Sequence, residues 1–192
     1  MPSHKQLIPS LFLAAMLASL GVSLSAASVG GVTVPDKVDV DGRSLLLNGA
    51  GIRTKFFIKI YVGGLYTTQK ESTADKVLAA DAPWRMAFHF LYGVSKSQMC
   101  DAWKEGLDDN SPSAPAQVKK DFTQLCDWME EIPKGNMMSV TYVPGKGATL
   151  EVNGKVKGTL AGKSTADAVL STWIGPKPGP GQAFKKAVLG AQ

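Results

Sequence analysis

The sequence predicts an α+β fold, in which a large antiparallel β-sheet carries helices packed on one face. Two observations predict it. Stretches of alternating apolar and polar residues are separated by short turns such as Asp41-Gly42 and Asn153-Gly154, a combination typical of antiparallel strands. Stretches with helical periodicity come in runs instead of following each strand in turn, which favours α+β over a parallel α/β arrangement.

The first 27 residues are predicted to be a secretory signal peptide, which leaves residues 28–192 as one domain. Lys5 precedes an apolar run, and the small residues 25–27 suit cleavage after Ala27. An uncleaved membrane anchor is the alternative, but Pro9 and a Gly- and Ser-rich second half make a poor spanning helix, which needs about 20 strongly apolar residues. The protein is therefore expected to be periplasmic or secreted, without stable membrane insertion after cleavage.

Charge and cysteine content narrow the function classes. The net charge is +5, but the basic residues are spread along the chain without interleaved aromatics, so nucleic acid is not expected as a partner. His89 is the only histidine after residue 27, and no metal site is predicted. Cys100 and Cys126 fall on apolar helix faces of an exported chain, which predicts a disulfide between two helices, with two free buried thiols as the alternative.

Strands are predicted from alternating apolar residues. The predicted segments are two strands within 36–49 around Asp41-Gly42, a long strand over 54–68, a strand over 83–93, and a meander over 137–143, 147–152 and 155–160. A turn is expected at 48–51, before the long strand. In that strand the apolar residues Phe56, Ile58, Ile60 and Val62 recur at every second position, so this face is expected to meet the core.

Five helices are predicted, at about 72–80, 95–107, 116–131, 164–173 and 182–189, with a loop over 108–116. Ser95 is followed three residues later by Gln98, which is the pattern of a capping box for the second helix. Ser164 is expected to cap the fourth helix.

Polar residues interrupt the long apolar strand. Arg53, Lys59 and Tyr61 form either a solvated outer face or a polar cluster at the mouth of a cavity, and a tyrosine next to paired glycines suits the cavity mouth. His89 is either a partly buried core residue or an axial haem ligand. The sequence contains no phosphate-binding loop and no nucleophile elbow, so no catalytic residue is predicted.

Three segments carry a resemblance to a known family. They are GAGIR (49–53) with KFFIKIYVGGLY (55–66), ADAVLSTWIGPKPGPG (166–181), and more weakly LYGVSKSQMCDAW (91–103). On these segments the chain resembles the chalcone isomerase-like family, in its bacterial, non-catalytic type, over about residues 37–190. The resemblance implies the family's fold, an open-faced β-sandwich with a ligand cleft between the sheet and the helices.

The resemblance implies no flavonoid cyclisation. The plant enzymes of this family use an arginine, a strand threonine, a helix tyrosine, a helix asparagine and a late-helix threonine. Arg53 matches the arginine and Thr172 the late-helix threonine, but Tyr61 stands at the strand threonine, Lys96 at the helix tyrosine and Trp103 at the asparagine. The groups that organise the substrate ketone and its water are thus replaced, and a tryptophan would fill space that a flavonoid ring needs.

The resemblance favours a fatty-acid-binding function. Family members that bind fatty acids hold the carboxylate with an arginine and a tyrosine at the positions of Arg53 and Tyr61. Eight residues of straight strand span about 26 Å, so these two side chains can converge only if the chain folds back or bulges between them. The expected ligand is a fatty acid or similar elongated apolar molecule, with no cofactor, and the expected ligand-binding residues are Arg53, Lys59, Tyr61, Lys96, Trp103 and Thr172. An isomerase or lyase acting on an unknown enone, a haem protein, and an assembly protein that binds a partner segment remain as alternatives.

Overall fold

The computed structural model describes residues 26–190, so the expected signal peptide lies outside the described residues except for Ala26 and Ala27. These two residues begin strand β1 (Ala26–Val29). Cleavage after Ala27 would therefore remove the first half of that strand. Among residues 26–190, no helix combines the length and the apolar character needed to cross a bilayer.

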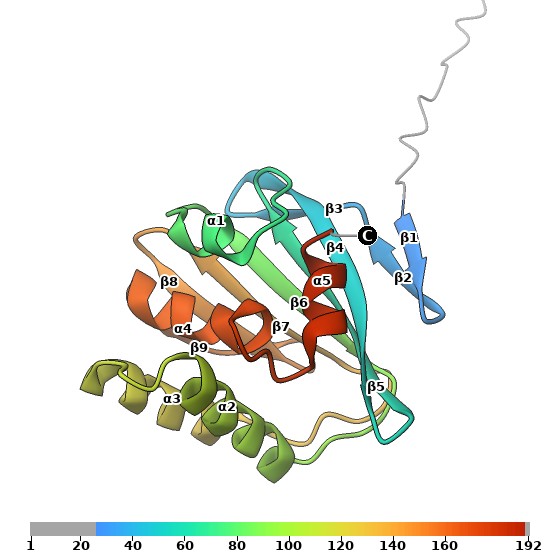
Figure 1. Ribbon diagram of the computed structural model, residues 1–192. Coiled ribbons are helices and arrows are strands. Elements are labelled where there is room, and N and C mark those ends of the chain that lie inside the picture. The colour runs from blue at the N-terminus through green and yellow to red at the C-terminus, as the bar shows by residue number, and fades with distance from the viewer. Residues whose placement is uncertain (1–25, 191–192) are drawn as a thin grey trace, which may run out of the picture.

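Seven strands form one antiparallel sheet in which the spatial order is the order of the chain (Figure 1). The strands are β3 (Lys37–Val40), β4 (Arg43–Lys55), β5 (Ile58–Thr67), β6 (Trp84–Phe90), β7 (Met137–Val143), β8 (Gly147–Val152) and β9 (Lys155–Leu160). Asp41 and Gly42 have positive φ angles of 51° and 74°, as do Asn153 and Gly154 with 52° and 75°, which is the backbone of the favoured two-residue hairpin turns. The predicted sheet is confirmed, and the meander has the predicted bounds.

The five helices of residues 26–190 cover one face of this sheet (Figure 1). They are α1 (Ala74–Ala79), α2 (Lys96–Asn110), α3 (Ala116–Trp128), α4 (Lys163–Ile174) and α5 (Gln182–Val188). Helix α4 is the most buried of them, because nine of its 12 residues, all between Thr165 and Ile174, are buried. The main hydrophobic core lies between these helices and strands β5 to β8.

A short hairpin covers part of the opposite face of the sheet. Strand β1 pairs with β2 (Val32–Pro35), and Val34 packs against Leu45, Val62 and Tyr66 in a second apolar cluster. The Tyr66 hydroxyl donates a hydrogen bond to the Pro35 carbonyl oxygen at 3.0 Å. The sequence prediction missed this hairpin. The remaining outer face is only partly covered, since His89 on β6 is half-buried there.

The predicted strand over 54–68 is confirmed over Ile58–Thr67, but its start is wrong. Strand β4 continues through the expected turn at 48–51, with an irregularity between Leu47 and Gly49, and the chain instead turns at Phe56 and Phe57 before β5 begins. The expected apolar face is also wrong: Val62 faces the outer cluster, whereas Tyr61 and Leu65 face the helices.

Gly49 and Gly51 suggested the wrong turn, because these glycines make room for a helix and do not form a turn. Helix α5 lies so close to β4 and β5 that a methyl group on Gly51 would lie 2.9 Å from the Ala187 side chain. One on Gly63 would lie 2.7 Å from the Phe184 ring, and one on Gly49 would collide with the Ala187 carbonyl oxygen. Glycine in a strand interior marks such a close approach as readily as it marks a turn.

Three helix boundaries differ notably from the prediction, and one is the end of α3, which lies at Trp128 and not at 131. The Ser95–Gln98 capping box is present as predicted, but α4 begins after Gly162, so Ser164 lies inside the helix and does not cap it. Helix α2 continues to Asn110 because the Asn110 amide bonds both the backbone nitrogen and the carbonyl oxygen of Lys177 in the Pro-rich turn. The link between these distant segments is a tertiary contact that local sequence does not show.

The predicted disulfide is confirmed: Cys100 on α2 is bonded to Cys126 on α3. Its removal should lower stability, because the bond closes a loop with a sequence separation of 26 residues. On the chain-entropy relation the loss for Cys100→Ser/Cys126→Ser is about 3–4 kcal/mol. Urea unfolding with and without reductant measures it. Reductant should destabilise the native protein and leave the double variant unchanged, and equal sensitivity of both would contradict the assignment.

Replacing the two residues of the β4–β5 turn with residues that favour its backbone conformation should stabilise the protein. Phe56 and Phe57 have positive φ angles of 47° and 66°, a left-handed conformation that costs about 1–2 kcal/mol per non-glycine residue and favours Asn-Gly. Phe56→Asn/Phe57→Gly is therefore expected to raise the free energy of unfolding by about 1–3 kcal/mol. The matched control places Phe-Phe at Asp41 and Gly42, where stability should fall. Thermal or urea unfolding of both variants tests the pair.

Candidate functional site

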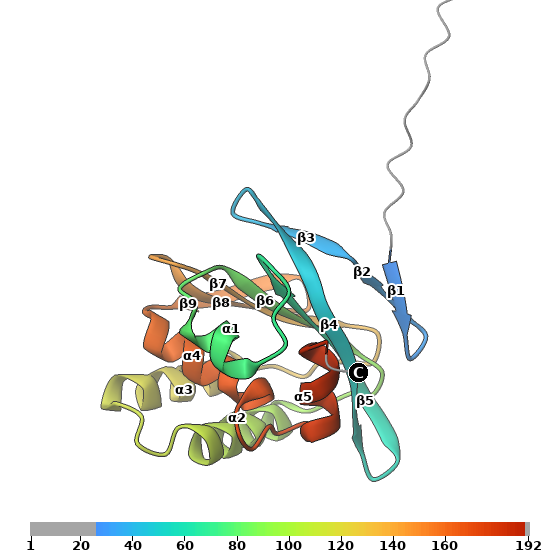
Figure 2. The same ribbon diagram turned by 45° about the horizontal axis from the view of Figure 1, so that its top comes forward.

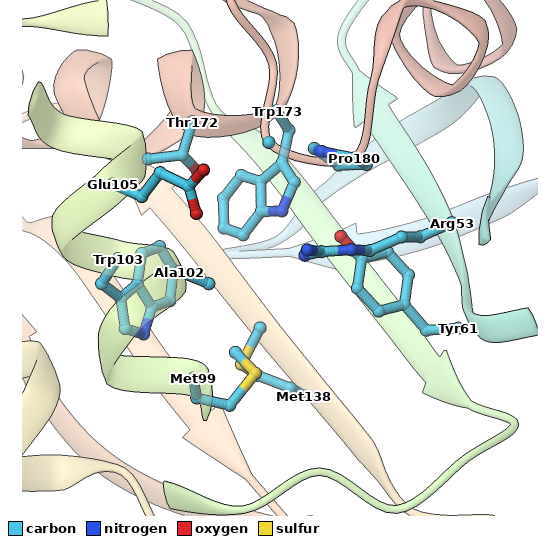
Figure 3. A pocket seen from close by; sticks show the side chains of 11 residues that line it. Arg53, Tyr61, Met99, Ala102, Trp103, Glu105, Met138, Thr172, Trp173 and Pro180 are labelled. Carbon is cyan, nitrogen blue, oxygen red and sulfur yellow. The ribbon is translucent and has the colours of Figure 1, made fainter. Parts of the chain in front are cut away.

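A cleft lies between helix α2, the end of α4 with its Pro-rich turn, and strands β4 and β5 (Figure 3). It has an inner compartment of about 30 Å³ and an outer one of about 160 Å³. Five residues line both: Arg53, Tyr61, Met99, Ala102 and Glu105. The inner compartment is otherwise lined by Trp103, Met138, Thr172, Trp173, Gly179 and Pro180. The outer one is otherwise lined by Lys55, Ile60, Phe90, Val94, Gln98 and Asp101.

The fold brings Arg53 and Tyr61 together. They are directly opposite each other in the register of β4 and β5, next to an irregularity between Arg53 and Thr54. The Arg53 guanidinium carbon lies 5.8 Å from the centroid of the Tyr61 ring (Figure 3). The chain reverses direction at Phe56 and Phe57, and this turn allows the side chains of Arg53 and Tyr61 to converge.

The Tyr61 hydroxyl is a buried donor without a partner. The side chain is 3% exposed, and its oxygen makes no hydrogen bond within residues 26–190. Phe88, Phe90 and Phe184 surround the ring edge-on at centroid distances of 5.0, 5.5 and 5.8 Å. Burial raises the pKa of this phenol, and the Arg53 charge offsets part of that rise. The phenol therefore stays protonated at neutral pH and can donate to an acceptor that enters the cleft.

Arg53 supplies an uncompensated positive charge at the same point. Its side chain is half-buried, and it takes part in none of the ion pairs formed within residues 26–190. Glu105 lines the same cleft from α2, but it is exposed and lies more than 4.0 Å from the guanidinium, across the cavity in Figure 3. A guanidinium and a phenol without acceptors form a receptor for a small anion, above all a planar carboxylate.

Two tryptophans close the inner end of the cleft. Trp103 and Trp173 pack edge-to-face with a centroid distance of 5.2 Å, and Trp173 also packs on Phe88. The Trp103 indole nitrogen is buried without a hydrogen-bond partner within the described range. Figure 3 shows the Trp173 ring on the side of the cleft that faces Arg53. These rings reduce the inner compartment to about 30 Å³.

Thr172 lines the inner compartment, but its hydroxyl is already used. It donates to the Val169 carbonyl oxygen at 2.8 Å within helix α4. Its methyl side packs on Gly106 of α2, where an added methyl group would lie 2.8 Å away. Thr172 thus holds α2 and α4 together and contributes shape to the cleft.

Two predicted ligand-binding residues lie outside both compartments. Lys96 is exposed and its amino group donates to the Asp127 carbonyl oxygen at 2.9 Å, which ties α2 to α3. Lys59 is exposed on β5 opposite Thr54. Sequence reasoning missed Lys55, Met99 and several other lining residues; helical spacing from Trp103 was the one signal that could have identified Met99.

His89 lies on the sheet face opposite the cleft. It is opposite Val62 in the register of β5 and β6 and is half-buried, while its neighbours Phe88 and Phe90 face the helices. Within residues 26–190, no group of three or more His, Cys, Asp or Glu side chains is arranged to hold a metal ion. The haem alternative would therefore need a site on the outer face, away from the cavity.

The chain is similar in sequence to one protein family and in fold to a solved plant protein. The sequence profile of a family described as chalcone isomerase-like matches residues 26–190. Among solved structures, the Arabidopsis thaliana fatty-acid binding protein AtFAP1 superimposes with a TM-score of 0.67 at 17% sequence identity, covering 87% of this chain and 97% of that one. At this identity the likeness establishes the fold. A search of curated proteins finds no match.

The unpartnered phenol predicts an unusual stability effect. Tyr61→Phe removes a buried hydroxyl that bonds nothing within the described residues, so the apoprotein should be unchanged or more stable by up to about 1 kcal/mol. Tyr66→Phe is the matched control, because it removes a hydroxyl that is bonded to Pro35 and should cost about 0.5–1.5 kcal/mol. Urea unfolding of both variants without ligand makes the comparison. A larger loss in Tyr61→Phe would show that the hydroxyl has a partner in solution.

Proposed function

This chain belongs to the chalcone isomerase-like family, and we propose from that premise that its cleft binds the carboxylate of a fatty acid, or of a similar elongated apolar acid, without chemical conversion. One observation carries the proposal: Arg53 and Tyr61 meet at the junction of the two compartments, and neither has an acceptor within residues 26–190. The fold shared with AtFAP1, a protein named for fatty-acid binding, supports it.

The head group would lie between the guanidinium and the phenol. A carboxylate there accepts a charge-assisted bond from Arg53, worth about 1.5–3 kcal/mol, and a neutral one from Tyr61, worth about 0.5–1.5 kcal/mol. It also satisfies a phenol that otherwise remains without a partner in a buried place. The carboxylate is an acceptor only, so it matches the guanidinium N–H groups of Arg53 and the free O–H of Tyr61.

The acyl chain would follow the outer compartment. This compartment is the larger one, and Ile60, Phe90, Val94 and Met99 give it an apolar wall. Each buried methylene contributes about 0.8 kcal/mol, so about a dozen supply on the order of 10 kcal/mol before the costs of association. Chains longer than the compartment require the side chains of Met99 and Met138, which both line the inner compartment (Figure 3), to move aside. Methionine is suited to this because its thioether stem is flexible.

The cleft favours binding over catalysis. The raised pKa of Tyr61 makes this phenol a poor general base. Lys96, at the position of the plant enzymes' helix tyrosine, lies outside the cleft, and Trp103 occupies the place of their asparagine. The residues that organise a chalcone ketone are therefore not assembled here.

The site of action would be outside the cytoplasm, in the periplasm or after secretion. The Cys100–Cys126 disulfide supports this, because such bonds persist in oxidising compartments. The apolar N-terminal segment supports it as well.

Arg53→Ala should weaken binding of a long-chain acid about tenfold to a hundredfold, since about 1.4 kcal/mol corresponds to tenfold. It should change the affinity for the corresponding methyl ester little, because the ester has no charge to pair. Tyr61→Phe should act in the same direction with a smaller effect. Titration calorimetry with acid and ester in parallel measures these differences.

Lys59→Ala is the matched control, because it removes a positive charge from the same hairpin outside both compartments. It should leave the affinity for the acid within about twofold of the unmodified protein. If Arg53→Ala weakened acid and ester equally, its role would be structural and the carboxylate site would be wrong. If affinity did not grow with chain length, the acyl route would be wrong.

Chalcone should not be isomerised at an appreciable rate. The measurement is the absorbance loss of a 6′-hydroxychalcone over time with chiral analysis of the product, against the uncatalysed reaction. Lys96→Tyr/Trp103→Asn, which restores the residue types of the plant enzymes, is the informative companion. Rapid formation of a single flavanone enantiomer by the unmodified protein would refute the non-catalytic assignment.

A further inference from the structure

The tip of the β4–β5 hairpin exposes a group of large apolar side chains. Phe56 is 83% exposed, Phe57 is fully exposed and Ile58 is 45% exposed. Figures 1 and 2 show from two directions that the tip of this hairpin projects from the end of the sheet. Two phenylalanines at the end of a projecting hairpin contribute nothing to the core, so their presence calls for a role outside folding.

The backbone of the tip strengthens this point. Phe56 and Phe57 are both in the left-handed conformation that Asn-Gly adopts most easily. Among the described residues, the other two-residue turns with two positive φ angles use favoured residues, namely Gly30-Gly31, Asp41-Gly42 and Asn153-Gly154. The aromatic pair is thus kept at this one turn against local conformational preference, and strain of this kind is concentrated at functional positions.

Positive charge surrounds the exposed aromatics. Lys55 and Lys59 immediately flank the tip, and both are exposed. Between Asp41 and Glu71 the chain contains no acidic residue, so the whole β4–β5 hairpin carries only basic charges. Aromatic side chains framed by lysines match an anionic lipid surface, where phenylalanine enters the acyl boundary and lysine binds the head groups.

The tip is also adjacent to the cleft. Lys55 on one side of the turn and Ile60 on the other line the outer compartment. A surface that receives Phe56 and Phe57 would therefore lie close to the mouth of that compartment. A ligand that partitions into lipid could then pass between the surface and the cleft without crossing much water.

We propose that residues 55–59 dock this protein on an anionic lipid bilayer, with Phe56 and Phe57 inserted and Lys55 and Lys59 on the head groups. A folded protein partner fits less well, because two or three side chains of roughly 150–250 Å² each bury less than the roughly 800 Å² per partner of a stable interface. The docking is independent of what the cleft binds, so it can be tested apart from the proposed function.

The test is co-sedimentation of the purified protein with vesicles of phosphatidylcholine and phosphatidylglycerol in a 3:1 ratio, and with vesicles of phosphatidylcholine alone. The protein should bind the anionic vesicles more tightly, and added salt should weaken that binding. Phe56→Asn/Phe57→Gly should lose at least tenfold in partitioning while remaining folded, because it installs the favoured turn. Lys59→Gln should lose about fivefold on anionic vesicles and little on neutral ones.

Val156→Asn is the matched control, since Val156 is another exposed apolar residue, on β9 away from the hairpin. It should bind vesicles as the unmodified protein does, because it leaves the hairpin and its charges unchanged. Equal partitioning of the Phe56→Asn/Phe57→Gly variant, or no binding to either vesicle, would overturn the proposal. Sedimentation without lipid tests a second alternative. If the unmodified protein is a dimer and the Phe56→Asn/Phe57→Gly variant is a monomer, the tip binds a second copy of the chain and the proposal is overturned.

Discussion

The close contact of helix α5 with the backbone of β4 and β5 sets the positions of the groups around the cleft. Glycines on the strands allow it, and Phe184 fills the space that their missing side chains leave. The same phenylalanine packs edge-on against Tyr61 and holds that ring at the floor of the cavity. The Pro-rich turn that joins α4 to α5 then passes along the edge of the inner compartment. Larger residues at these glycine positions would push α5 away from the strands and enlarge the cleft.

Several features that lower the stability of the fold lie around the cleft and the β4–β5 hairpin. Tyr61 and Trp103 bury polar atoms without partners within the described residues, Arg53 holds an unpaired charge, and Phe56 and Phe57 take a strained backbone. The rest of the fold provides the compensating stability, through a continuous core and a disulfide between α2 and α3. Such departures from local preference are expected where a protein binds something, because they remain only if the whole structure tolerates them.

The cleft and the hairpin tip are parts of one element. The two strands that place Arg53 opposite Tyr61 also end in the exposed aromatic turn. Because only a few residues separate Arg53 and Tyr61 from the tip, the position of the hairpin at a surface would also orient the cleft. The proposed binding of an apolar acid and the proposed lipid docking are thus geometrically compatible, although each rests on different side chains.

The sequence by itself determined the features that depend on local chemistry. The β7–β9 meander, the capping box at Ser95 and the α+β class follow from alternation, turn residues and helix periodicity, which act over a few positions. The sequence also identified two residues of the candidate site, since Arg53 and Tyr61 are polar residues within an otherwise apolar stretch. Tertiary structure alone decided whether they meet. The hairpin turn carries Phe-Phe where Asn-Gly would signal it, and the glycines that suggested a turn at 48–51 instead make room for a helix more than 130 residues later in the chain. Register across β4 and β5 brought Arg53 to Tyr61, and helix packing placed Lys96 outside the cleft, because both depend on contacts between segments distant in sequence.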